Sequence, residues 1–232
     1  MSSGYRRAPE GTDPPRLFAA YKSTVKRAPL HPPVRVTQSI SEITGPSLGR
    51  ELLRDGDADL TRFDGGDALG ERIIVSGRVL DEDGRAIRNT LLEIWQANAC
   101  GRYAHRGDQH RAPLDPHFLG VGRAGTNETG QYRFVTIKPG AYPWKNHHNA
   151  WRPAHIHFSL FGPAVATRLI TQMYFPGDPL LDLDPIFNSI PDREARERLI
   201  AKFDIDLTVP EYALGYRFDF VMRGRTATPA LE

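Results

Sequence analysis

Two histidines separated by one residue lie in the stretch Ala154–Leu160, which reads AHIHFSL. Side chains alternate across a β-strand, so His155 and His157 share one face and the apolar residues around them share the other. Cα atoms two positions apart in a strand lie only about 7 Å from each other, so both imidazoles can reach one metal ion. The pattern equally suits two ordinary polar residues on a solvated strand, and the spacing alone leaves both interpretations open.

Further ligands near this strand face would be tyrosines rather than acids. Residues 158–163 read FSLFGP and bring no carboxylate, although His147 and His148 lie in the preceding loop. Tyr103 in ACGRYAHRGD and Tyr142 in KPGAYPWKN both fall in loops that follow expected strands. A loop tyrosine is often just a half-buried ring with a wet hydroxyl. A metal site of two histidines and two tyrosines is therefore a hypothesis at this point.

The elements that would position these side chains are those of a β-sandwich. The chain holds 21 Gly and 19 Pro in 232 residues, and these turn-formers separate short β-branched or alternating stretches. Strands are expected over 72–80, 90–97, 131–137, 154–160, 168–175 and 216–223, with a turn at 161–163. A helix is expected over Pro191–Phe203, with Asp192 as its N-cap, and a weaker helical tendency covers Leu17–Lys22. The predicted fold class is mainly β: a sandwich core with long loops, an extended N-terminal arm and one peripheral helix.

Composition divides the chain into two parts. Residues 1–50 are rich in Pro, Ser and basic residues without a steady period, which predicts an arm that makes subunit contacts. Residues 51–232 contain every expected strand and form the predicted sandwich domain.

The overall composition favours a soluble protein of a reducing compartment. Apolar residues make up 40% and charged residues 25%, so a disordered chain or a fibre is excluded. A formal net charge of +2 is too even for a polyanion-binding surface, and no nucleic-acid partner is expected. No apolar run approaches the roughly 20 residues of a membrane span, and the first residues lack the apolar stretch of a signal peptide. With Cys100 as the sole cysteine, we expect no disulfide. We also expect a cytoplasmic location and no membrane partner.

Several stretches resemble the intradiol ring-cleaving dioxygenases. They are GERIIVSGRVLDEDG, NTLLEIWQANACGRY, APLDPHFLGVGR, IKPGAYPWKN, WRPAHIHFSLFGP and LITQMYFPGDPL, and the similarity runs from about Tyr21 to about Arg223. The resemblance implies that residues 51–232 form a catalytic domain and that Fe(III) is the cofactor. The implied iron ligands are Tyr103, Tyr142, His155 and His157.

The resemblance also implies roles for the residues around the ligands. Tyr142 would leave the iron and take a proton from the substrate, while Arg152 would stabilise developing negative charge. Gln172 and Tyr174, two positions apart on one strand, would face the same cavity and orient substrate or oxygen. Trp144 would contact the substrate ring, and Tyr21 matches a family residue near the substrate carboxylate. Without the resemblance, a loop salt bridge for Arg152 and a plain polar strand face for Gln172 and Tyr174 remain the simpler interpretations.

The implied activity is cleavage of protocatechuate (3,4-dihydroxybenzoate) by O₂ to 3-carboxy-cis,cis-muconate, in the breakdown of aromatic compounds through the β-ketoadipate pathway. The complete ligand set implies the catalytic β subunit of a hetero-oligomer whose sister α subunit lacks those ligands. Two alternatives stay open: a family member acting on catechol or hydroxyquinol, and a non-catalytic sandwich whose histidines are incidental or hold zinc.

Overall fold

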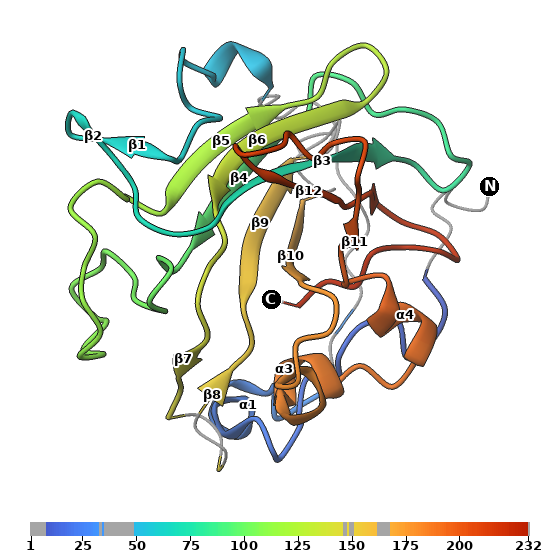
Figure 1. Ribbon diagram of the computed structural model, residues 1–232. Helices are drawn as coiled ribbons and strands as arrows, with labels where there is room; N and C mark the ends of the chain where they lie inside the picture. The colour runs from blue at the N-terminus through green and yellow to red at the C-terminus, as the bar shows by residue number, and fades with distance from the viewer. Residues whose placement is uncertain are drawn as a thin grey trace.

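The computed structural model describes residues 8–32, 34, 49–145, 148, 151–161 and 168–231. Within these residues, two large sheets pack face to face (Figure 1). The first sheet has the antiparallel order β10 (Leu169–Tyr174), β9 (His155–Phe161), β4 (Leu91–Gln96) and β5 (Val121–Gly125). In the second, β3 (Arg72–Leu80) lies between β6 (Gln131–Ile137) and the pair β12 (Leu214–Arg217) and β13 (Phe220–Val221), and β11 (Lys202–Phe203) is at the edge. The predicted β-sandwich is confirmed.

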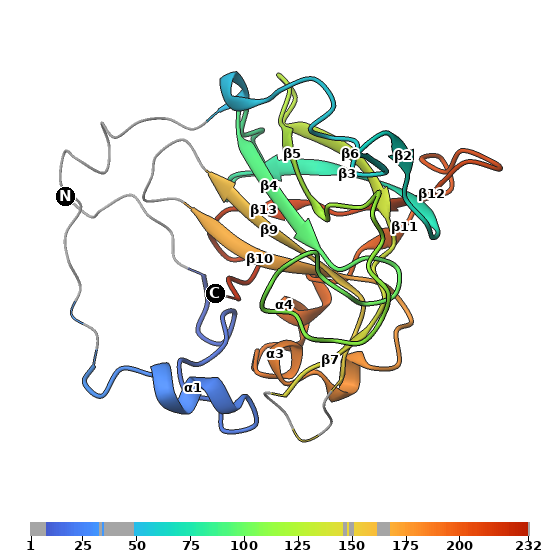
Figure 2. The same ribbon diagram turned by 90° about the vertical axis from the view of Figure 1, so that its left-hand side faces the viewer.

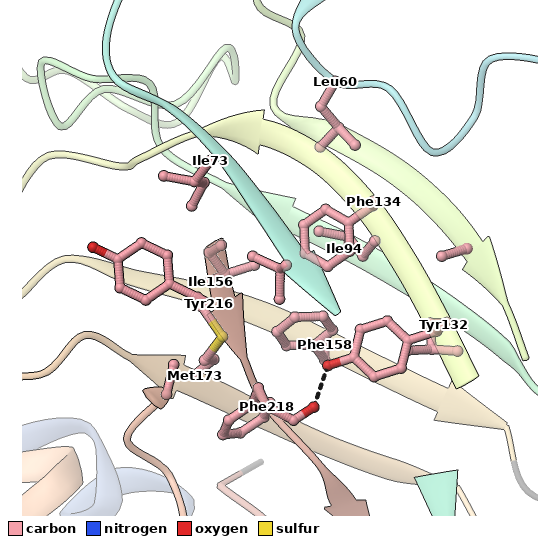
Figure 3. Close-up of a cluster of buried hydrophobic side chains, with 14 of the residues drawn as sticks. Leu60, Ile73, Ile94, Tyr132, Phe134, Ile156, Phe158, Met173, Tyr216 and Phe218 are labelled. Carbon is pink, nitrogen blue, oxygen red and sulfur yellow. Dashed lines mark hydrogen bonds between the residues drawn. The ribbon is translucent and has the colours of Figure 1, made fainter. Parts of the chain in front are cut away.

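The core between the sheets comes from the alternating apolar positions of their strands (Figure 3). Ile156 and Phe158 of β9 are fully buried and meet Phe134 of the opposite sheet. Tyr132 lies in the same cluster, and its hydroxyl donates a 2.6 Å hydrogen bond to the Phe218 carbonyl. Because these residues occupy the inner face of β9, the histidines between them are left on the outer face.

The strand predictions are confirmed to within about two residues, except at the C-terminal end. There the predicted strand 216–223 is divided into β12 and β13, which keep one register along β3. Between them the side chain of Asp219, not its backbone, accepts the Arg78 N–H bond. At this point the Phe218 carbonyl lies so close to Gly77 that a Cβ there would be 1.8 Å from its oxygen. This approach requires glycine at position 77, and the Phe218 carbonyl oxygen accepts its bond from the Tyr132 hydroxyl.

The helices are shorter and more numerous than predicted. The expected helix over Pro191–Phe203 is reduced to α4 (Arg193–Glu197), with Asp192 as its N-cap as predicted. The chain then pairs with Tyr174 through Leu199 and Ala201. Leu199 and Ile200, whose apolar side chains at helical spacing favoured the longer helix, therefore belong to a turn and a bridge. The other helices of the described residues are α1 (Lys22–Arg27), which begins where the predicted helical tendency ends, and α3 (Pro185–Asn188).

These helices gather at one end of the sandwich, beside the hairpin of β7 (Tyr142–Pro143) and β8 (Trp151–Arg152) (Figures 1 and 2). They form a second apolar cluster there, with Tyr174, Phe187 and Leu199 buried in it. The remaining short elements are the strands β1 (Arg62–Phe63) and β2 (Gly66–Asp67) and the 3₁₀ turns η1 (Arg50–Leu52) and η3 (Leu181–Leu183).

The described part of the N-terminal arm packs on its own chain. Asp13 accepts a 2.8 Å hydrogen bond from the backbone of Ala230, and Gly11 accepts one from the backbone of Asp192. The arm is therefore tied to the helical end of the sandwich. Residues 33 and 35–48, the tip of the 161–163 turn and His147 lie outside the described residues, and the domain boundary at residue 50 stays a prediction.

Candidate metal centre

The outer face of β9 carries both histidines into a buried site. His155 is 1% exposed and His157 is 8% exposed. In the register of the sheet, Tyr174 lies opposite His155, while Gln172 and Trp95 flank His157 from its two neighbouring strands. Trp95 stacks on the His157 ring at a centroid distance of 4.9 Å and an angle of 9°. A solvated polar strand face, the simpler interpretation of His-x-His, does not describe this arrangement.

The two tyrosines approach the histidine face from separate loops. The loop after β4 is ordered by Asn98, whose side-chain oxygen accepts hydrogen bonds from the backbones of Cys100 and Arg102. Asp108 then accepts a 2.8 Å bond from the Tyr103 backbone. Tyr142 lies in β7, directly opposite Arg152 in β8, so the hairpin delivers both side chains together.

Glycines allow the two tyrosine loops to touch. The Gly140 N–H donates a 2.9 Å hydrogen bond to the Asn98 carbonyl. Gly101 has a φ of +75°, and a Cβ there would lie 2.0 Å from the Ala141 carbonyl oxygen. Any larger residue would separate the loops, so the spacing of Tyr103 and Tyr142 depends on this contact.

Four donor atoms, here called the four-donor cluster, converge beside β9: the two phenol oxygens of Tyr103 and Tyr142 and the Nε2 atoms of His155 and His157. Tyr142 Oη is 3.2 Å from His155 Nε2, which is 3.2 Å from His157 Nε2. His157 Nε2 is in turn 3.1 Å from Tyr103 Oη. Atoms that bind one ion at about 2.1 Å lie about 3 Å apart when they are neighbours. The cluster therefore has the spacing of a single-ion site.

The hydrogen bonds of His155 show which of its nitrogens is available. Nδ1 is 2.7 Å from the Pro153 carbonyl oxygen, which can only accept. Nδ1 therefore carries the proton, and Nε2 presents its lone pair to the four-donor cluster. Among the described residues no three His, Cys, Asp or Glu side chains form a metal-binding group, so an ion here requires the tyrosine oxygens.

Burial controls protonation in the site. Loss of hydration, together with the charge of Arg152, lowers the pKa of His157 to about 3 and that of His155 well below its usual value. Both imidazoles are thus neutral, the form that binds metal. Burial, reinforced by Tyr142, raises the pKa of Tyr103 well above 10. Its phenolate therefore requires a nearby cation, which is what a metal ion in the cluster would supply.

Arg152 is buried at the edge of the cluster and is 2% exposed. Its Nη1 lies 3.0 Å from His155 Nε2. Its Nη2 donates to Gln172 at 2.8 Å and to the Tyr174 hydroxyl at 3.1 Å. An ion pair of 2.8 Å joins it to Asp184, which is fully buried. Arg152 therefore does not form a salt bridge in an exposed loop, because both Arg152 and Asp184 are buried next to the four-donor cluster.

Trp144 and Tyr21 form the side of the site nearest α1. Their rings lie 5.0 Å apart, and the Arg152 guanidinium lies over the Trp144 ring at 5.3 Å. The nine residues to which the resemblance gives a role are thus brought to one end of the sandwich. Sequence reasoning missed Asp184: the Asp-Pro pair at its position indicates a helix N-cap, but nothing in the pattern pairs it with a residue 32 positions earlier. It also missed Trp95, which looks like an ordinary strand residue.

Comparison with known proteins identifies the class. The family model described as "Dioxygenase" matches residues 43–224, and the model described as "Protocatechuate 3,4-dioxygenase beta subunit N terminal" matches residues 5–39. The chain belongs to the intradiol dioxygenase family.

Two curated relatives and one solved structure show which members of the family are similar to this chain. The chain is 57% identical over 218 residues to the protocatechuate 3,4-dioxygenase beta chain of Burkholderia cepacia, covering 93% of this chain and 92% of that one. It is 33% identical over 165 residues to the alpha chain of Pseudomonas putida, covering 70% and 76%. Among solved structures, 3-chlorocatechol 1,2-dioxygenase from Rhodococcus opacus 1CP matches with a TM-score of 0.53 and 26% identity, over 70% of this chain and 63% of that one.

None of the helices in the described residues is long and apolar enough to cross a bilayer.

Proposed function

We propose that this chain is the iron-bearing β subunit of an enzyme that cleaves protocatechuate with O₂ between its two hydroxylated carbons, giving 3-carboxy-cis,cis-muconate. The observation that carries the proposal is the four-donor cluster, whose neighbouring atoms lie 3.1–3.2 Å apart. The beta chain of Burkholderia cepacia, which is 57% identical over 93% of this chain, bears the name of this activity. The reaction would belong to aromatic catabolism through the β-ketoadipate pathway, and a cytoplasmic location stays a prediction.

The donor set suits Fe(III). Phenolate oxygens are hard, anionic ligands, and neutral imidazoles complete the set without further charge. Tyr103, Tyr142, His155 and His157 would hold the ion. When bound, Fe(III) accepts electron density from a chelating catechol and so makes the ring reactive toward O₂.

The surrounding residues bind, orient and move protons. Tyr142 lies on a short hairpin and is the ligand that would leave, its phenolate taking a proton from the incoming catechol. Arg152 directs Nη1 toward the cluster, where a fixed positive charge stabilises negative charge that develops on the substrate. Gln172 accepts from Arg152 and would help to orient substrate or O₂.

The substrate would bind beside the four-donor cluster, next to Trp144 and Tyr174. Trp144 would contact the aromatic ring, and Tyr174 lies in the same face beside Arg152. Tyr21, next to Trp144, would lie near the substrate carboxylate. A carboxylate on the ring distinguishes protocatechuate from catechol, so this contact is where substrate choice would be decided.

The proposed partner is an α subunit. An alpha chain from Pseudomonas putida is related to this chain over 165 residues, and the N-terminal match to a beta-subunit model covers residues 5–39. The exposed apolar side chains of the N-terminal segment, Leu17, Val25 and Leu30, would be covered by such a partner.

The proposal is tested by oxygen uptake of the chain co-expressed with an α subunit. Protocatechuate should be consumed faster than catechol or hydroxyquinol, and the product should have the absorbance of 3-carboxy-cis,cis-muconate. A yellow semialdehyde would mean extradiol cleavage and contradict the proposal. Full turnover by the chain alone would contradict the requirement for a partner.

A further inference from the structure

Asp184 is a buried carboxylate beside the four-donor cluster that is neither a predicted ligand nor a predicted substrate contact. Its exposure is 0%. It stands between η3 and α3, where its Oδ1 accepts the N–H bond of Ile186 as the helix N-cap. The same carboxylate holds Arg152 at two points, with Oδ2 2.8 Å from Nη2 and Oδ1 3.4 Å from Nε.

Two contacts on one edge of a guanidinium fix the direction of the opposite edge, because the group is planar. The opposite nitrogen, Nη1, points to His155 Nε2 at 3.0 Å. Gln172 and Tyr174 also hold Nη2, but both are neutral. Asp184 is the one described carboxylate in contact with this guanidinium, so it supplies the charge that balances the buried cation.

We propose that Asp184 is a positioning residue: it directs Nη1 of Arg152 toward the four-donor cluster and the substrate bound there. The inference rests on the proposed function, because it assigns Arg152 a task in catalysis. A guanidinium without a counter-charge would be repelled by the iron and would lose its fixed direction. Asp184 touches none of the four ligands. Besides Arg152, its Oδ2 accepts a 3.1 Å bond from the Tyr174 hydroxyl, so a double-mutant cycle with Arg152 is needed to show which of the two contacts carries its effect.

The Asp184→Asn variant tests the inference, because Asn caps a helix as well as Asp does and has the same shape. The four ligands are unchanged, so iron content and the visible absorption of the resting enzyme should match those of the unchanged protein. The kcat should fall about 100-fold, the size of the loss when one fixed transition-state contact is removed. The dissociation constant for protocatechuate, titrated without oxygen, should stay close to that of the unchanged enzyme. Asp184→Glu, which retains the charge, should recover part of the lost kcat.

The matched control is Asp192→Asn. Asp192 is the N-cap of α4 and accepts the Glu194 N–H bond at 3.0 Å, but it makes no described contact with Arg152. This variant should keep full kcat. An equal loss in both variants would mean that the effect is general destabilisation, and it would overturn the proposal.

A double-mutant cycle decides whether Asp184 acts through Arg152. Adding Asp184→Asn to Arg152→Gln should lower kcat no further, since the residue that Asp184 positions is already gone. Multiplying losses would overturn the proposal, and so would full kcat in Asp184→Asn. Removing both charges also avoids an unpaired buried ion, so the double variant should fold even if Asp184→Asn alone does not.

A crystal structure of the iron-free Asp184→Asn variant separates this inference from the proposed function. If that variant does not fold, the single variant Asp184→Glu, which retains Arg152, takes its place. Nη1 should move away from His155 Nε2, and an unmoved guanidinium would overturn the inference. Absence of iron and turnover in the unchanged protein would instead contradict the proposed function.

Discussion

Replacement of Gly101 by alanine tests whether the contact between the two tyrosine loops sets the metal site. The new Cβ would lie 2.0 Å from the Ala141 carbonyl oxygen, whereas carbon and oxygen atoms in contact are about 3.3 Å apart. The loops must therefore separate by about 1.3 Å at this point. Metal–ligand distances tolerate only about 0.2 Å, so the shift at Gly101 is several times larger than the site can absorb.

The expected result is a loss of iron affinity of about 10- to 100-fold, the range found when support for a ligand is disturbed. The positive φ of +75° adds about 1–2 kcal/mol of strain for any residue with a Cβ. Iron content at a fixed free-iron concentration, measured with the visible absorption, gives the first effect. Chemical denaturation of the iron-free protein gives the second.

Gly84→Ala is the matched control. Gly84 has a φ of +77°, but a Cβ there would meet nothing within 4 Å. This variant should lose about 1–2 kcal/mol of stability and keep full iron binding. The reasoning is refuted if Gly101→Ala binds iron with the affinity and colour of the unchanged protein, or if Gly84→Ala loses iron to the same extent.

Three further variants probe the ligands and the core. Tyr103→Phe should lose most of the visible absorption and activity, and retention of both would remove Tyr103 from the ligand set. His157→Ala should abolish tight iron binding, as measured by metal analysis after dialysis; an unchanged iron content would count against the four-donor cluster. Tyr132→Phe, which leaves the buried Phe218 carbonyl without its 2.6 Å donor, should lower the free energy of unfolding in urea by about 1–3 kcal/mol. Its iron content should not change, because the bond lies in the sandwich core.

Much of the sandwich could be predicted because its strands carry local signals. The β-branched residues of Arg72–Leu80 and the alternation in Gln131–Ile137 set the strand bounds that are found in β3 and β6. Pro191–Phe203 shows the limit of such patterns. Its apolar spacing suits a helix, but the helix ends at Glu197, and beyond it the Leu199 carbonyl accepts from the Tyr174 N–H while the Ala201 N–H donates to the Tyr174 carbonyl. The residue that replaces the helical bonds, Tyr174, lies in another strand of the chain. The apolar spacing of 191–203 contains no information about that strand.

The candidate site likewise has parts that the sequence predicts and parts that it does not. Strand alternation places His155 and His157 on one face, and the family resemblance supplies the tyrosines. The contacts that hold the site together depend on distant segments. Asp184 reaches Arg152 from the start of a four-residue helix, and Gly101 meets Ala141 across two loops. Each looks like a common turn or cap residue in the sequence, because only the folded chain brings its partner near.

The visible spectrum of the purified protein loaded with one equivalent of Fe(III) tests the central claim most directly. If the phenol oxygens of Tyr103 and Tyr142 bind the ion, charge transfer from tyrosinate to Fe(III) should make the solution burgundy-red. An iron-loaded protein that stays colourless would show that the oxygens do not touch the metal, and it would contradict the site described above.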